Sequence, residues 1–262
     1  MRPLCLLRQL AIAAGFIALV SGCAGGVTYN PTVVAWEIDE ERLAANPIKT
    51  VVIAHVNLGA PSRNYLEREE ARIDGYVSVY LKDNGFKVLP QRLFTAHWNT
   101  AVRAFGNPVD PTTGKMNVRT FSQIMISVRD RLQEESKLDA FVFTDLIEVE
   151  TAFNGGLKHL ARWDGVTRKP ALQGTGNAVS ADFNWNAPVA AASLQVSIYD
   201  MELQRLFTSR GGLDATDAID TRSSQGKYVR RRNMLENEDH IKEGVRLALH
   251  PLIKMEDWPG NP

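Results

Sequence analysis

The sequence predicts an α/β protein in which a single mixed β-sheet is packed with helices. In the first half of the chain, apolar segments with the length and composition of strands alternate with amphipathic helical patterns. In the second half, residues 191–214 alternate between apolar and polar side chains around a short turn, which is typical of an antiparallel hairpin. A final helical pattern follows near residues 237–253.

Three strands and two helices are expected in the first half. The strands cover residues 48–58, 86–90 and 138–151, and the first is β-branched and apolar nearly throughout, as in strands buried on both faces. One helix begins at a capping box that starts at Asn64, and a second helix precedes the third strand. Their apolar faces consist of Leu66, Ile73, Val77 and Leu81, and of Phe121, Ile124, Met125, Val128 and Leu132. Residues 91–117 are expected to be irregular.

The second half carries the signals of two hairpins. The pair Asp164-Gly165 predicts a type I′ turn, because that turn needs positive φ at both central positions. In the later hairpin, one face is expected to be buried and the other solvated. The apolar side chains are those of Leu194, Val196 and Ile198, and the polar ones those of Ser193, Gln195 and Ser197.

The start of the chain has the pattern of a secretory signal peptide. Arg2 and Arg8 precede or flank an apolar run at residues 10–20, which is too short to span a bilayer as a helix of about 20 residues. The run ends in Val20, Ser21, Gly22 and Cys23, which resembles the bacterial lipobox. The alternative is an ordinary signal peptide with a chance cysteine.

The lipobox resemblance implies cleavage before Cys23 and acylation of that residue, including palmitate. Because Ala24 rather than aspartate follows, the resemblance favours the outer membrane, with the domain facing the periplasm. Several acyl chains on one residue make a stable anchor, whereas a single chain gives only marginal binding. We therefore expect a signal peptide at 1–22, a lipidated cysteine and tether at 23–47, and one periplasmic α/β domain at 48–255. Within the tether, residues 32–36 could alternatively pair as an edge strand.

Composition limits the partners. The chain has 30 basic and 30 acidic residues, so it lacks the basic excess of a typical nucleic-acid-binding protein, and no nucleic-acid partner is expected. Its two cysteines are Cys5, in the expected signal peptide, and Cys23. The expected mature domain thus has neither a disulfide nor a thiolate metal site.

Several segments together resemble the TolB amino-terminal-domain-like fold of the CsgG–FlgO–LpoB-like group of lipoproteins, and in particular uncharacterised envelope lipoproteins. The segments are "TVVIAHV", "LKDNGFKVL", "LDAFVFTDLIEVE", "ARWDGV" and "SLQVSIYDMELQRLF". The resemblance implies an envelope accessory protein that contacts other proteins and that often forms homo-oligomers. Residues 151–190 are too charged and broken to form the alternating strands of a membrane pore, so no pore is expected.

Motifs of common enzyme and nucleotide sites are absent from the sequence, and we expect no catalysis, no cofactor and no metal. The five histidines, His55, His97, His159, His240 and His250, are not at ligand spacing. The carboxylates Asp139, Asp145, Glu148 and Glu150 could form an acid–base pair, but solvated strand ends are the favoured interpretation. A hydrolase that uses Asp145 and His159 is one rival hypothesis.

Two other features could bind ligands or partners. Trp163, with Trp185, could offer an aromatic face to peptidoglycan or another carbohydrate, although a hairpin aromatic packed on its neighbour is favoured for Trp163. A basic cluster could contact anionic headgroups or an acidic partner, or could be a solvated loop. The cluster consists of Lys227, Tyr228, Arg230, Arg231 and Arg232. The sequence therefore predicts a docking or assembly factor, with a carbohydrate-binding lipoprotein as the alternative.

Overall fold

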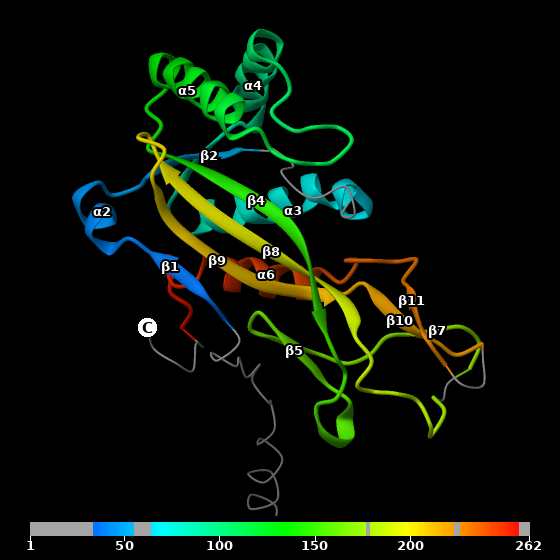
Figure 1. Cartoon of the computed structure of the whole chain (residues 1–262). Helices are drawn as coiled ribbons and strands as arrows, with labels where there is room; N and C mark the ends of the chain where they lie inside the picture. Colours follow the sequence, from blue (N-terminus) through cyan, green and yellow to red (C-terminus); the bar gives the residue numbers. More distant parts are fainter. Residues whose placement is uncertain (1–33, 55–63, 177–178, 223–225, 257–262) are drawn as a thin grey trace, which may run out of the picture.

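The computed structural model describes residues 34–54, 64–176, 179–222 and 226–256, and it has the predicted α/β class. Its main element is a mixed six-stranded sheet in the order β1-β9-β8-β4-β2-β3 (Figure 1). The strands are β1 (Trp36–Ile38), β2 (Thr50–Ala54), β3 (Lys87–Leu89), β4 (Ala140–Thr151), β8 (Val189–Asp200) and β9 (Arg205–Ala215). β2 pairs in parallel with β3 and β4, and the other pairings are antiparallel.

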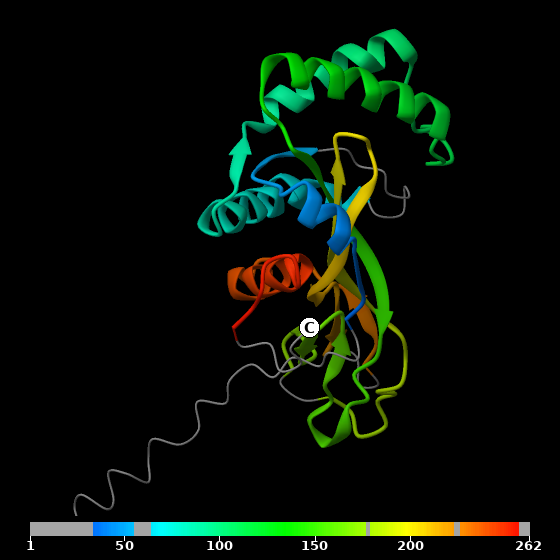
Figure 2. The ribbon, with the colours of Figure 1, turned by 90° about the vertical axis from the view of Figure 1, so that its left-hand side faces the viewer.

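Helices cover the two faces of this sheet unequally (Figure 2). One face packs against α3 (Asn64–Asp83) and α6 (Glu238–Leu249), whose apolar residues join those of β4, β8 and β9 in the largest core cluster. The other face packs against α4 (Gln91–Phe105) and α5 (Val118–Glu135) at one end only. The remaining helix, α2 (Glu40–Ala45), follows the edge strand β1.

The far end of the molecule carries two small sheets beyond the reach of α4 and α5 (Figure 1). One is the hairpin of β5 (Ala161–Trp163) and β6 (Val166–Arg168), which follows the 3-10 turn η3 (Gly156–Lys158). The other joins β7 (Leu172–Gln173), β10 (Asp217–Asp220) and β11 (Tyr228–Arg230). A separate core cluster that includes Phe153, Trp163 and Val189 lies beneath them.

Both predicted hairpins are present, but the solvated face expected for the later one is wrong at Ser193, which is fully buried, while Gln195 and Ser197 are half-buried. Asp164 and Gly165 have φ of 37° and 83° between β5 and β6, so both central residues are left-handed as a type I′ turn requires. β8 and β9 form the later antiparallel hairpin, and α6 is the predicted final helix, capped by Asn237. The Asn64 side chain, expected to cap α3, lies outside the described residues.

Two expectations are wrong. Residues 91–105 are not irregular but form α4, in which Phe94 and Ala101 are buried. The expected tether is folded from Trp36 onward, because β1 pairs with β9 at the edge of the main sheet, in agreement with the edge-strand alternative for residues 32–36. The domain therefore begins before residue 48. The expected signal peptide, the cleavage motif Val20-Ser21-Gly22 and Cys23 lie outside the described residues.

Candidate functional site

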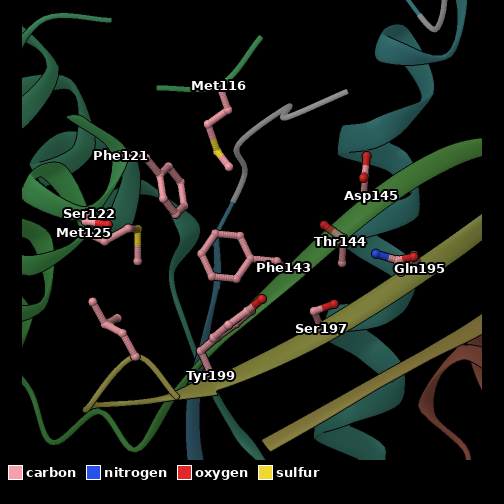
Figure 3. Close-up of a pocket in the computed structure, with 11 residues that line it drawn as sticks. Met116, Phe121, Ser122, Met125, Phe143, Thr144, Asp145, Gln195, Ser197 and Tyr199 are labelled. Atoms are coloured by element: carbon pink, nitrogen blue, oxygen red, sulfur yellow. The ribbon is translucent and has the colours of Figure 1, made fainter. Parts of the chain in front are cut away.

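A pocket of about 280 Å³ lies between α5 and the sheet, where β4 and β8 emerge from beneath the helix (Figure 3). Alternate residues of paired strands form its floor, since Phe143 pairs with Ser197 and Asp145 with Gln195. The lining residues are Met116, Phe121, Ser122, Met125, Phe143, Thr144, Asp145, Gln195, Ser197, Tyr199 and Leu203. They come from three separate stretches of the chain, residues 116–125, 143–145 and 195–203, which the folded sheet and α5 bring together.

One end of the pocket is apolar. Phe121 of α5, Phe143 of β4 and Tyr199 of β8 form a continuous aromatic row, with ring centroids 6.4 Å apart for the first pair and 5.5 Å for the second. Met125 is buried beside them, while Met116 at the rim is 40% exposed. Methionine side chains adapt to irregular partners. This end can therefore accept an apolar group of more than one shape.

The aromatic row continues into the core. Trp98 of α4 lies 6.0 Å from Phe121, and it stacks on Phe94 at 5.7 Å. Phe94 in turn meets Phe141 of β4 edge-on at 6.1 Å. Aromatic pairs at such separations stabilise packing beyond the area that they bury. The apolar wall thus continues, through Phe121 and Trp98, into the buried rings of Phe94 and Phe141.

The opposite end of the pocket is polar. Among the described residues that line it, Asp145 is the one carboxylate, and it lies beside Gln195 and Ser197 (Figure 3). The Oε1 atom of Gln195 accepts a hydrogen bond of 2.9 Å from Nε of Arg210. The Ser197 hydroxyl is 2.9 Å from that of Thr208. Both side chains are thereby oriented by β9.

The polar groups of the pocket are a carboxylate, an amide and hydroxyls. Ser197 shares its hydrogen bond with another hydroxyl, and no histidine is among the described residues that line the pocket. A serine nucleophile needs an adjacent base to be activated. Across the described part of the chain, no group of three or more His, Cys, Asp or Glu side chains is arranged to hold a metal ion. The pocket offers an apolar cavity with a carboxylate, an amide and a hydroxyl at one end.

The basic cluster is not the free surface that the sequence suggested. Arg230 lies 3.2 Å from Glu148 and 3.4 Å from Asp217, and its guanidinium covers the ring of Tyr65. Arg231 makes a 2.7 Å ion pair with Asp214. Both arginines fasten β11 to the main sheet. Arg230 and Arg231 therefore have structural roles within the domain, and a further contact of either residue with a partner or a headgroup stays a prediction.

The remaining members of the cluster differ from one another. Tyr228 packs against Phe153 and Phe183, and its hydroxyl is buried without a hydrogen-bond partner among the described residues. Burial raises the pKa of Tyr228 to about 12. Lys227 and Arg232 are exposed. Arg230 is exposed as well, although it is ion-paired, whereas Tyr228 is half-buried with its ring packed inward. The partner or headgroup contact expected for this cluster stays a prediction.

The carbohydrate contact proposed for Trp163 is also wrong. Trp163 is 6% exposed, and its indole Nε1 donates to the carbonyl oxygen of Ala192 at 3.3 Å. It packs beneath the hairpin, as the alternative interpretation predicted. Trp185 is half-buried and stacks on His159, with centroids 3.6 Å apart and planes within 9°. One face of that indole is therefore covered by the domain itself.

The other sequence candidates are dispersed. Asp139 accepts hydrogen bonds from the backbone N–H groups of Lys49 and Thr50, so it holds strand β2. His97 lies 3.0 Å from Glu135, and His250 is buried at the end of α6. Asp145 lines the pocket while His159 stacks at the far end, so the structure does not bring this pair together. His55 lies outside the described residues.

The chain matches no protein-family model, and no curated protein or solved structure matches it significantly. The resemblance to the TolB-like lipoprotein group therefore stays a prediction. In the described residues, no helix is both long and apolar enough to cross a membrane.

Proposed function

We propose that this protein is a lipid-anchored lipoprotein of the bacterial outer membrane that acts in the periplasm by docking to an envelope protein, without catalysis. The observation that carries the docking role is the pocket beneath α5, with its aromatic wall and exposed methionine rim. The lipobox pattern at residues 20–23 supports the anchor and the location. The TolB-like group is the family we propose for the fold.

The pocket fits an anchor residue of a partner protein. Its volume of about 280 Å³ is near the lower bound of roughly 300 Å³ for pockets that enclose a drug-sized ligand. Interfaces concentrate their binding energy in a few side chains that fill such pockets near the centre of the contact. We propose that an aromatic or long aliphatic side chain enters the apolar end and that Asp145 and Gln195 receive hydrogen bonds from the same segment.

The surface around the pocket supports a contact larger than one side chain. Val118 at the start of α5 is 65% exposed, and with Met116 it extends the apolar rim. Val118, Phe121 and Met125 follow one another at helical spacings of three and four residues, so they share a face of α5. A partner segment that lies along α5 can therefore meet this face and the pocket together.

The carbohydrate-binding alternative has lost its main support. Both tryptophans that motivated it are packed within the domain, Trp163 by burial and Trp185 by the His159 ring. Sedimentation with purified sacculi tests it directly, and retention of the protein by the sacculi would restore it.

Photo-crosslinking in intact cells tests the docking proposal. A photoreactive amino acid replaces Met116 at the rim, and the expected result is a discrete crosslinked adduct with another envelope protein. Ser122→Trp places an indole at the pocket mouth, whereas Gln123→Trp places it on the adjacent exposed position of the same helix. The adduct should be lost with Ser122→Trp and kept with Gln123→Trp.

Two results would decide against this assignment. An adduct that persists in Ser122→Trp would show that the pocket is not used, and the lack of any discrete adduct would remove the docking claim. An adduct with twice the mass of the chain would identify the partner as a second copy, in agreement with the homo-oligomers that the resemblance implies.

A further inference from the structure

A single leucine projects from the end of the molecule that is opposite the pocket. Leu157 of η3 is 100% exposed, the highest value among the exposed large apolar residues described. η3 directly precedes the β5–β6 hairpin, which lies at the far end from α4 and α5 (Figure 1, Figure 2). We define residues 155–160 as the tip. An isolated exposed leucine is ordinary on a surface, so the case depends on what holds and surrounds it.

The backbone of the tip is built to hold Leu157 outward. Gly155 and Leu160 exchange two backbone hydrogen bonds of 2.9 and 3.3 Å, which close the loop at its base. A Cβ on Gly155 would lie 2.4 Å from the carbonyl oxygen of Leu160, so this close approach needs glycine. Gly156 and His159 have positive φ of 63° and 49° on either side of Leu157. The leucine is thus presented by a closed, defined turn.

Basic and aromatic side chains accompany the leucine. Lys158, Arg162 and Lys169 are exposed on the tip and on the hairpin that follows it. The carboxylate nearest in sequence, Asp164, accepts a 2.6 Å hydrogen bond from Ser193 and is engaged within the domain. His159 stacks on Trp185 directly beside the tip. Basic residues are attracted to anionic headgroups by about 1 kcal/mol each, and tryptophan favours the membrane interface.

The path of the chain brings this end close to the expected anchor. The described chain starts at Val34, which lies so near the β5–β6 turn that a Cβ on Gly165 would be 2.8 Å from it. Residues 24–33 are all that separate Val34 from Cys23. Eleven peptide units span at most roughly 40 Å, whatever their conformation. Gly165, which lies near Val34, is seven residues from Lys158, so the tip is at most about 25 Å from this turn.

These observations lead to one inference, which rests on the proposed lipid anchor. We infer that the tip contacts the bilayer surface, with Leu157 inserted among the acyl chains and Lys158 against the phosphate of anionic phospholipids. The anchor confines the β5–β6 end near the membrane, and the tip then fixes which way the domain faces. The pocket beneath α5 is directed away from the bilayer, toward a partner in the periplasm.

Site-specific fluorescence tests this inference on the lipidated full chain in vesicles. Because Cys23 is acylated in that material, a cysteine introduced elsewhere is its single free thiol. Asn154→Cys places an environment-sensitive label on an exposed residue beside the tip, and Ile126→Cys places it on exposed α5 as the matched control. The vesicles contain phosphatidylethanolamine, phosphatidylglycerol and a lipid that carries a quencher within the acyl region.

The expected result is quenching of the label at residue 154 and none at residue 126. Adding Leu157→Asp to the Asn154→Cys chain should abolish the quenching, since a carboxylate is not inserted into hydrocarbon. Equal signals at both positions, or quenching that survives Leu157→Asp, would overturn the inference. A change in fluorescence that depends on the protein concentration and not on the lipid concentration would assign the tip to a contact with a second copy of the chain. That result would also overturn the inference.

The experiment separates this inference from the proposal on which it rests. The intact mass of the labelled protein reports acylation independently of the fluorescence. An acylated protein without quenching at residue 154 contradicts the tip contact alone. An unmodified Cys23 contradicts the anchor itself.

Discussion

Nη1 of Arg168 lies 2.7 Å from Oε2 of Glu243, and the two side chains are only 6% and 13% exposed. Nε of the same arginine donates to the carbonyl oxygen of Leu213 at 2.8 Å. Arg168 therefore ties the β5–β6 hairpin to both α6 and β9. Through this contact the tip that carries Leu157 is fixed to the core of the domain.

Breaking this ion pair on one side should be costly. Arg168→Met leaves the Glu243 carboxylate buried without its partner, and we expect the free energy of unfolding to fall by about 3–5 kcal/mol. Replacing both residues with methionine should recover most of that loss. Urea unfolding measures both changes. Arg162→Met, on the exposed side of the same hairpin, is the control. Its free energy of unfolding should stay within about 0.5 kcal/mol of the wild-type value. Equal losses in Arg168→Met and Arg162→Met would contradict the role of the pair.

A second prediction concerns the contact of α6 with β9. A Cβ on Gly211 would lie 1.9 Å from the carbonyl oxygen of Gly244, closer than real atoms approach. Gly211→Ala should therefore push α6 off the sheet and lower the free energy of unfolding by about 2 kcal/mol or more. Gly75→Ala is the contrast, because nothing lies within 4 Å of its Cβ in α3. Gly75→Ala should raise the free energy of unfolding by about 0.5–1 kcal/mol, because alanine has a higher helix propensity than glycine. A Gly211→Ala protein as stable as the wild type would show that α6 and β9 do not pack as described.

A third prediction follows from Asp214. Burial raises the pKa of Asp214, but nearby His240 and the ion pair with Arg231 outweigh it, so the pKa lies below its usual value. The folded state then holds fewer protons on this group than the unfolded state does. Its contribution to stability is present above the unfolded pKa of about 3.9 and is lost as the pH falls through the folded pKa.

Asp214→Asn should therefore destabilise the protein by about 1–3 kcal/mol at neutral pH and by clearly less near pH 3. Denaturant unfolding of both proteins at the two pH values measures the difference. A loss of the same size at both values would mean that the charge of Asp214 does not contribute.

A fourth prediction compares two tyrosines. The pKa of each is raised to about 12, chiefly by burial, but only Tyr65 has a partner for its hydroxyl, which donates to Glu148. The buried hydroxyl of Tyr228 has none among the described residues. Tyr228→Phe should thus leave stability unchanged or raise it by about 1 kcal/mol, whereas Tyr65→Phe should lower it by about 1 kcal/mol. Thermal unfolding of the two variants checks the sign, and a marked loss in Tyr228→Phe would reveal a partner for that hydroxyl.

Local patterns were enough to predict most elements of the fold. The β-branched composition of β2, the helical spacing of Leu66 and Ile73 in α3, and the Asp164-Gly165 turn each depend on interactions within a few residues. The spacing of Phe94, Trp98 and Ala101 also fits a helical face, so α4 has a local signal even though residues 91–117 were expected to be irregular. β1 is different: its three residues form a strand because they pair with β9, about 170 positions away.

The pocket could be anticipated only in part. The polar alternation of Gln195 and Ser197 suggested a solvated face, and that face does form the polar end of the pocket. Its apolar wall requires Phe121, Phe143 and Tyr199 to meet, and their contact is set by the packing of α5 on the sheet. Likewise, the ion pairs of Arg230 and Arg231 depend on acids from other strands. A charge run in the sequence does not reveal whether its charges are already neutralised.

The most direct test of the account is the intact mass and membrane fractionation of the wild-type protein beside Cys23→Ser. The anchor, the orientation of the tip and the exposure of the pocket to the periplasm all depend on acylation at this residue. The account predicts that wild-type protein carries the mass of acyl chains and fractionates with the outer membrane, whereas the variant is released from it. Wild-type protein with an unmodified Cys23, released to the same extent as the variant, would contradict it.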